Sequence, residues 1–215
     1  MYISRVEINP RLRACRQALS SPQRLHAMIE SSYPASLTSN TEHRHLWRLD
    51  KIGYSLFILV VSPDRPDFTH LIEQIGWPAS GQIWETKDYD HFLGRIDAGQ
   101  QWHFRLRANP TQSVKNTDNR NERGKIVPCS TIDGQKNWLL SRIAKHGASL
   151  IGFELVNREV SQFTRDGKVV TLNVATFEGV LTVVTPELLR EALTNGIGRA
   201  KAYGCGLLTL ASEQT

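Results

Sequence analysis

The sequence predicts an α+β fold in which one order of elements (strand, helix, strand, strand, helix, strand) occurs twice. Short segments with the alternating or continuous hydrophobicity of strands are interleaved with segments whose apolar residues recur at helical spacing. The length of 215 residues suits two domains of roughly 100 residues each. Because 40% of the residues are hydrophobic and 22% are charged, the chain can bury a core and is not expected to be disordered.

Six elements are expected in the first half of the chain. Tyr2–Ile8 alternates polar and apolar residues, as a strand does. A helix is expected to open at Ser21-Pro22, since serine suits the N-cap and proline the first helical position, and to end at Tyr33-Pro34, since proline cannot continue a helix. The other four are strands at His45–Asp50 and Ser55–Val61 around a turn at Lys51-Ile52-Gly53, a helix at Phe68–Ile75 and a weaker strand within Tyr89–Ile96.

The second half repeats this order. Gln101–Ala108 alternates aromatic or aliphatic residues with polar ones and is expected to form a strand that Asn109-Pro110 ends. Thr111–Ser130 is polar and is expected to be a mobile loop. The later elements are a helix at Ile132–His146, strands at Leu150–Val160 and Val169–Val184 joined by a hairpin turn at Asp166-Gly167, a helix from Pro186 and a strand at Gly206–Ala211.

Two successive units of this order match two tandem ferredoxin-like domains. We place the boundary near Asp97-Ala98-Gly99, which gives an N-terminal domain over residues 1–97 and a C-terminal domain over residues 98–215. A fold of this kind serves many functions, so the function has to be argued from individual residues.

Charge and cysteine content narrow the setting of the protein. There are 26 Lys and Arg residues against 21 Asp and Glu, a net charge of +5, which weakly favours an anionic partner such as nucleic acid. Cys15, Cys129 and Cys205 are far apart and odd in number, which argues against a disulfide framework and indicates a reducing cytoplasm. The N-terminus lacks the apolar stretch of a signal peptide, and the apolar run at residues 55–61 is too short to span a bilayer.

The most distinctive local pattern is a glycine-rich segment near the C-terminus. Two glycine pairs, Gly196 with Gly198 and Gly204 with Gly206, enclose the basic residues Arg199 and Lys201. Glycine allows close approach of the backbone, so exposed amides and the two cations would suit phosphate oxygens. The segment lacks the ending of a P-loop, and a helix C-cap followed by a tight turn is the structural alternative.

These residues, with three others, carry a resemblance to a known family. The opening Met1–Val6, the segment Phe104–Pro110, the stretch Phe177–Leu181 and the glycine-rich segment resemble the CasE family, whose members cut the repeat RNA of type I-E CRISPR systems. The resemblance covers essentially the whole chain in the right order. It implies tandem ferredoxin-like domains that bind the CRISPR repeat hairpin, cleave at the 3′ base of its stem and stay bound with other subunits of the Cascade complex. It implies neither a small-molecule cofactor nor a membrane.

His26 is the candidate catalytic residue. It lies at the flank of the first expected helix, and a histidine there can transfer protons near neutral pH. The family has a Tyr-x-x-His pattern in this helix, but Gln23 occupies the tyrosine's place, and glutamine cannot act as a base. Glu30 and Tyr33 are possible neighbours of His26, and Tyr33 and Tyr203 are candidates for the second proton transfer. Glu30 could also raise the pKa of His26 and so favour a donor role.

No cluster of acidic residues of the kind that two-metal nucleases need is visible in the sequence, so no metal site is expected. The corresponding chemistry is attack by the RNA's own 2′-hydroxyl, which leaves a 2′,3′-cyclic phosphate. His43 and His45 are expected to be a solvated pair at the start of a strand.

Basic residues near the helix, on one strand, around the hairpin and in the glycine-rich segment are the candidates for RNA binding. They are Arg24, Arg105, Arg107, Arg158, Arg165, Lys168, Arg199 and Lys201. The hairpin is the best candidate for the RNA stem, because family members place a basic hairpin there. Two alternatives stay open: a non-catalytic RNA-binding subunit of the same lineage, which the replacement of tyrosine by Gln23 favours, and an enzyme that acts on a small phosphate compound held by the glycine-rich segment.

Overall fold

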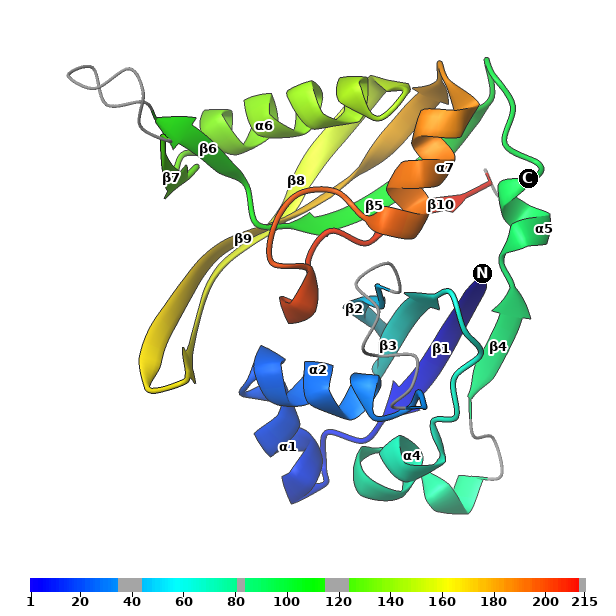
Figure 1. Ribbon diagram of the computed structural model, residues 1–215, viewed down its shortest axis with the longest axis vertical. Coiled ribbons are helices and arrows are strands. Elements are labelled where there is room, and N and C mark those ends of the chain that lie inside the picture. The colour runs from blue at the N-terminus through cyan, green and yellow to red at the C-terminus, as the bar shows by residue number, and fades with distance from the viewer. Residues whose placement is uncertain (35–43, 81–83, 115–123, 213–215) are drawn as a thin grey trace.

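Two four-stranded antiparallel sheets form the framework of the protein (Figure 1). The structure, a computed structural model, describes residues 1–34, 44–80, 84–114 and 124–212. The strand orders are β2-β3-β1-β4 and β10-β5-β9-β8, so in each sheet the first and third strands of the repeat lie in the centre. This is the ferredoxin-like arrangement used twice, and the predicted fold class is confirmed.

The first sheet and its helices run from the N-terminus to Leu93. The elements are β1 (Tyr2–Ile8), α1 (Arg13–Leu19), α2 (Pro22–Glu30), β2 (Leu46–Ile52), β3 (Ser55–Ser62), α4 (Thr69–Ile75), the 3-10 helix η1 (Pro78–Ser80), β4 (Glu85–Asp88) and α5 (Asp90–Leu93).

The second sheet and its helices follow. The elements are β5 (Gln101–Ala108), β6 (Thr111–Val114), β7 (Lys125–Pro128), α6 (Ile132–Lys145), β8 (Ala148–Arg165), β9 (Lys168–Val183), α7 (Pro186–Asn195), the 3-10 helix η2 (Lys201–Tyr203) and β10 (Leu208–Ala211). The long β8–β9 hairpin turns at Asp166 and Gly167, which both have positive φ (50° and 74°), as its sequence predicted.

Two predictions about the edges of the first half were wrong. The fourth strand is β4, and the segment Tyr89–Ile96 instead contains α5. Its buried residues Tyr89, Leu93 and Ile96 follow helical spacing, whereas β4 carries no apolar pattern and is held in the sheet by its pairing with β1. The first expected helix ends at Glu30 rather than at Tyr33-Pro34, since the chain already turns at Ser31.

Three further details differ from the sequence prediction. Helix α1 was not predicted, because its buried face consists of only Cys15 and Ala18. Strand β2 continues through Ile52, so the turn lies at Gly53. The segment Thr111–Ser130 is not simply a loop: β6 and β7 pair as a two-stranded ribbon around residues 115–123, which lie outside the described residues.

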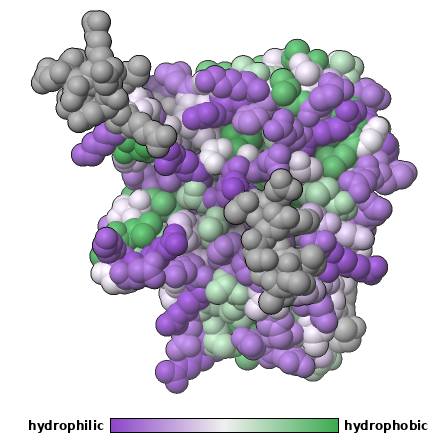
Figure 2. Space-filling view, in the orientation of Figure 1, coloured by the Kyte–Doolittle hydropathy of each residue, from purple (hydrophilic) through white to green (hydrophobic). Residues whose placement is uncertain are grey.

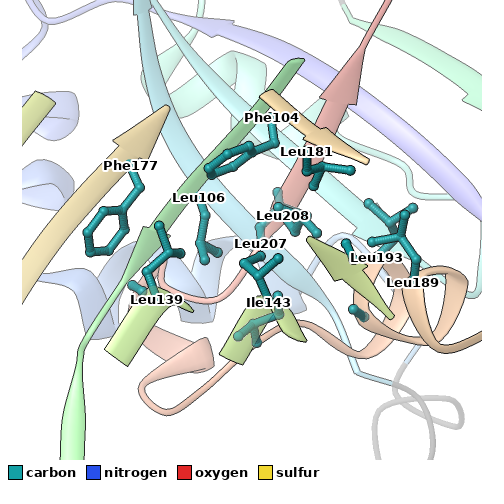
Figure 3. Close-up of a cluster of buried hydrophobic side chains, with 14 of the residues drawn as sticks. Phe104, Leu106, Leu139, Ile143, Phe177, Leu181, Leu189, Leu193, Leu207 and Leu208 are labelled. Atoms are coloured by element: carbon teal, nitrogen blue, oxygen red, sulfur yellow. The ribbon is translucent and has the colours of Figure 1, made fainter. Parts of the chain in front are cut away.

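Apolar side chains fill the space between each sheet and its helices. Figure 3 shows the cluster of the second half, in which β5, β9, α6 and α7 contribute the residues Phe104, Leu106, Leu139, Ile143, Phe177, Leu181, Leu189 and Leu193. Leu46 and Val61 of the first sheet belong to the same buried cluster. Because the two halves share this core, the boundary at residues 97 and 98 stays a prediction.

Arg48 on β2 joins the two sheets, which face each other with the helices on the outside (Figure 1). Its side chain is buried, and its guanidinium donates to both carboxylate oxygens of Asp50, at 2.8 and 2.7 Å. It also donates to the backbone carbonyls of Arg105 (3.0 Å) and Leu207 (3.1 Å) and to the hydroxyl of Thr209 (3.0 Å). One buried cation thus satisfies acceptors of the second sheet, and Asp50 balances its charge.

Arg48→Met is expected to lower the free energy of unfolding by about 3–5 kcal/mol, because it leaves Asp50 and the carbonyl groups without their buried partner. The exposed Arg13→Met is the control and should change it by less than about 0.5 kcal/mol. Denaturant melts of both variants measure the difference. An Arg48→Met protein as stable as the unmodified chain would show that this interaction does not hold the sheets together.

Candidate active site

His26 lies in the middle of α2 on the side that borders the second half of the protein. Ser21 and Pro22 start the helix, and Leu25 and Ile29 anchor it in the core. His26 lies at the flank of this buried face, as expected, and 28% of its side chain is exposed. The ring is therefore accessible to a ligand while the helix that carries it is fixed.

Glu30 connects His26 to a second histidine. Its Oε1 atom lies 3.6 Å from Nδ1 of His26, one helical turn away, and accepts a hydrogen bond of 2.9 Å from Nδ1 of His45. His45 is 3% exposed and stacks on Tyr33, with ring centroids 3.7 Å apart and planes 11° from parallel. The prediction that His45 is solvated was wrong, and His43 lies outside the described residues.

The surroundings of His26 lower its pKa below the ordinary value of 6.5. Burial is the largest cause, and His45 and Arg165 act in the same direction, whereas Glu30 raises the pKa by a smaller amount. Burial therefore outweighs Glu30, and His26 is neutral near pH 7. A neutral imidazole accepts a proton, so the site favours a base rather than the donor role that Glu30 alone suggested.

The other two predicted neighbours differ in their access to the site. Gln23 is partly exposed one turn before His26 on the same helix. Tyr33 is 5% exposed beneath His45, and burial raises its pKa well above the usual range. A buried tyrosine that holds its proton so firmly is poorly placed to exchange it with a ligand.

The glycine-rich segment packs against the first sheet rather than forming an open cradle. Gly196, Gly198, Gly204 and Gly206 all have positive φ, between 72° and 91°. A Cβ atom would lie 2.8 Å from Leu46 at Gly196, and 2.7 Å from the ring of Trp47 at Gly204. Both residues belong to β2, so glycine is needed here for contact between the two halves.

The backbone amides of this segment are engaged within the protein. The N–H groups of Gly196, Ile197, Gly204 and Gly206 donate to the carbonyls of Ala192, Gly206, Lys201 and Arg107. The expectation that exposed amides at these glycines bind phosphate was therefore wrong for these four groups. The alternative of a small-molecule phosphate site loses the feature on which it rested.

The glycine-rich segment also brings the hairpin close to α2. Helix η2 contacts both α2 and β2. The hydroxyl of Tyr203 in η2 accepts a hydrogen bond of 2.8 Å from Nη1 of Arg165, at the tip of the β8–β9 hairpin. Arg107 donates to the carbonyl of Gly204 at 2.9 Å and forms an ion pair with Glu159 on β8. The hairpin in Figure 1 consequently runs down beside α2 and α1.

The predicted basic residues divide into two groups. Four of them have partners within the protein: Arg105, Arg107, Arg158 and Lys201. Arg105 pairs with Glu178 at 2.6 Å and with Asp50 at 3.4 Å. Arg158 donates to Gln135 and to the carbonyl of Ser130, and Lys201 donates to the carbonyl of Asn195. Arg24, Lys168 and Arg199 are exposed. Arg165 is exposed as well, although it contacts Tyr203. Of these exposed cations, Arg24 lies on α2 itself, and Arg165 and Lys168 lie at the hairpin tip.

Among the described residues, no group of three or more His, Cys, Asp or Glu side chains could hold a metal ion. None of the described helices is long and apolar enough to cross a membrane. In the view of Figure 2, hydrophilic residues are prominent on the helices below the hairpin, whereas the hairpin itself shows both hydrophilic and hydrophobic residues. The three cysteines are buried and free.

Comparison with known proteins identifies relatives along the whole chain. A family model described as CRISPR associated protein matches residues 1–212. The CRISPR-associated endoribonuclease Cse3 of Thermus thermophilus is 30% identical over 225 residues, which cover 98% of this chain and 100% of that protein. The Cascade subunit CasE of Escherichia coli is 29% identical over 179 residues, 79% of this chain and 89% of that protein. The solved structure of Thermus thermophilus Cse3 bound to an RNA representing a pre-cleavage complex has a TM-score of 0.81 at 27% identity, over 98% of both chains.

Gly204→Ala is expected to destabilise the protein more than Gly53→Ala. Both positions have positive φ, which costs a residue with a Cβ about 1–2 kcal/mol, but only at Gly204 would the Cβ meet the ring of Trp47. That overlap should add about 1–3 kcal/mol to the loss of unfolding free energy. Denaturant melts measure both losses, and equal losses would show that the Trp47 contact does not constrain the segment.

Arg165→Ala is expected to raise the pKa of His26, because it removes a cation that disfavours the imidazolium. Lys168→Ala, across the same hairpin turn, is the matched control and should move it less. NMR titration of the His26 ring protons reads the pKa directly. If Arg165→Ala leaves the titration unchanged, the hairpin tip does not act on the catalytic helix in solution.

Proposed function

Because this chain belongs to the family of CRISPR-associated proteins, as a CasE-type Cascade subunit, we propose that it binds the CRISPR repeat hairpin and cleaves the RNA at the 3′ base of the stem. The product stays bound, and the protein remains associated with the other Cascade subunits. The observation that carries this proposal is the neutral, partly exposed His26 beside the basic tip of the β8–β9 hairpin, in a chain with a full-length endoribonuclease relative. A cytoplasmic location follows from this role.

The chemistry we assign is transesterification within the RNA. His26 takes the proton of the 2′-hydroxyl as this oxygen attacks the adjacent phosphorus. The bond from phosphorus to the 5′-oxygen breaks, and the 5′-oxygen leaves with a proton from a donor. The products are a 2′,3′-cyclic phosphate and a 5′-hydroxyl. The reaction needs no metal, because exposed cations such as Arg24 and Arg165 can stabilise the negative charge that develops on the phosphate.

The residue that protonates the leaving 5′-oxygen should be one of those around α2. Gln23 has no proton to exchange, and Tyr33 is buried beneath His45. Tyr203 presents its hydroxyl to Arg165 on the side of the segment that contacts α2. We therefore assign the donor role to Tyr203 ahead of Tyr33.

The RNA stem is expected to contact the hairpin. Arg165 and Lys168 flank the turn and are exposed, and duplex RNA is recognised mostly by its shape and its phosphates. Arg158 lies further along β8, where two of its five N–H donors hold Gln135 and the carbonyl of Ser130, and its exposed guanidinium keeps donors for phosphate.

The second candidate function is hairpin binding without cleavage. The observation in its favour is Gln23, which stands where the family has tyrosine. On that reading His26 lacks a partner for the second proton transfer, and the chain would retain an uncut repeat RNA.

His26→Ala is expected to lower the single-turnover cleavage rate of the repeat hairpin by roughly 10²–10⁴-fold, the usual worth of a positioned base. The hairpin Kd should stay unchanged, since phosphate contacts dominate binding. The assay is run in excess EDTA, where the unmodified protein should still cleave, and His91→Ala, an exposed histidine on α5, is the control.

Three outcomes would contradict parts of this proposal. Cleavage that requires Mg²⁺ would remove the metal-free mechanism. Full activity of a correctly folded His26→Ala protein would overturn the catalytic assignment. Tight binding of the hairpin by the unmodified protein with no cleavage would favour the non-catalytic subunit.

A further inference from the structure

His45 is a buried titratable group for which the cleavage chemistry has no direct use. Its side chain is 1% exposed, so it cannot touch RNA. It nevertheless shares a carboxylate oxygen with His26, because both Nδ1 atoms lie closest to Oε1 of Glu30. We propose that His45 is a positioning residue that holds Glu30 in place and, through Glu30, orients the catalytic ring of His26. This inference rests on the proposed function and adds a residue to it.

The hydrogen bond between His45 and Glu30 has a defined direction. A carboxylate oxygen accepts, so Nδ1 of His45 carries the proton that it donates over 2.9 Å. The same oxygen lies 3.6 Å from Nδ1 of His26, which is longer than an ordinary hydrogen bond but within the range of charge attraction. The hydrogen bond from His45 thus holds Glu30 in position. The contact between Glu30 and the more exposed His26 can still become stronger.

His45 is itself held rigidly. Its ring stacks on Tyr33, and it directly precedes Leu46 and Trp47, which are 0% and 2% exposed at the start of β2. These residues pack against the glycine-rich segment. His45 therefore ties the position of the Glu30 carboxylate to the first sheet, and not only to the nine-residue helix α2 that carries Glu30.

This arrangement suits a base that becomes charged during the reaction. With Nδ1 of His26 directed at Glu30, Nε2 is the nitrogen left to face the RNA. When His26 accepts a proton, the imidazolium is attracted to Glu30, which stabilises the transition state, and the contact can shorten as catalytic hydrogen bonds often do once substrate is bound. The titratable and charged groups that act on this ring are Glu30 on its own helix, His45 before β2 and Arg165 on β8. The element η2, which packs on α2, carries Lys201 and Tyr203.

The test removes the hydrogen-bond donor of His45 but keeps an aromatic ring at this position. His45→Phe retains an aromatic ring against Tyr33 and removes the N–H that holds Glu30. We expect the single-turnover cleavage rate of the repeat hairpin to fall by about 10–10²-fold, the effect of a small misplacement of a catalytic group, with the hairpin Kd unchanged. His45→Asn keeps a donor near the Nδ1 position and should cleave faster than His45→Phe.

The matched control is His70→Phe. His70 also contacts α2, with Nε2 3.0 Å from the carbonyl of Met28, but it does not touch Glu30. Its replacement should leave the cleavage rate unchanged. If His70→Phe and His45→Phe lose activity equally, or if His45→Phe cleaves at the unmodified rate, the positioning role is overturned.

A readout without RNA separates this inference from the proposed function. NMR titration of the RNA-free protein should show a lower His26 pKa in Glu30→Gln, which loses the negative charge, and a higher one in His45→Phe, because His45 lowers the pKa of His26. In the Glu30→Gln background the His45→Phe substitution should shift the His26 pKa by less than in the unmodified protein, because the part of its effect that acts through Glu30 is lost. Unchanged titrations or additive shifts in the double variant would overturn the inference. Failure of the unmodified protein to cleave any repeat hairpin would overturn the proposed function and leave the titration result standing.

Discussion

The contact between the glycine-rich segment and β2 is the constraint on which the rest of the structure depends. Glycines with positive φ bring the backbone of this segment onto Leu46 and Trp47, where a single Cβ atom would overlap these side chains. Next to this contact, the buried guanidinium of Arg48 on the first sheet donates hydrogen bonds to carbonyl groups of the second half. These two features fix the halves relative to each other, and η2 and the β8–β9 hairpin reach α2 only because the halves are fixed.

The candidate active site is accordingly a product of both halves. The first half supplies His26, Glu30 and His45, and the second supplies Tyr203 and the cation Arg165. Partial burial lowers the pKa of His26 and keeps it neutral, while the one carboxylate in contact with it opposes that shift. A base needs this balance, because it must be neutral before the reaction and stabilised once it carries the proton.

Several glycines and arginines that suggest nucleic-acid binding in the sequence serve the fold instead. The amides of the glycine-rich segment close its own turns, Arg107 holds the segment against β8, and Arg105 is paired with Asp50 and Glu178. A basic residue in a binding protein can therefore be part of the framework that positions the binding surface. Among the predicted residues, Arg24, Arg158, Arg165, Lys168 and Arg199 are exposed and remain available for phosphate.

The sequence alone determined the order of elements, the repetition of one domain type, the hairpin turn at Asp166-Gly167 and the placement of His26 at the flank of α2, because these depend on local backbone preference and on hydrophobic spacing. It could not place β4, whose stability comes from pairing with β1 rather than from its own pattern. It also could not reveal that His45 is buried against Tyr33 and bonded to Glu30, 15 residues earlier, or that the glycines face Trp47 and Leu46. Those contacts join segments distant in the chain, so only the tertiary structure decided which polar residues are exposed to solvent and which are engaged within the protein.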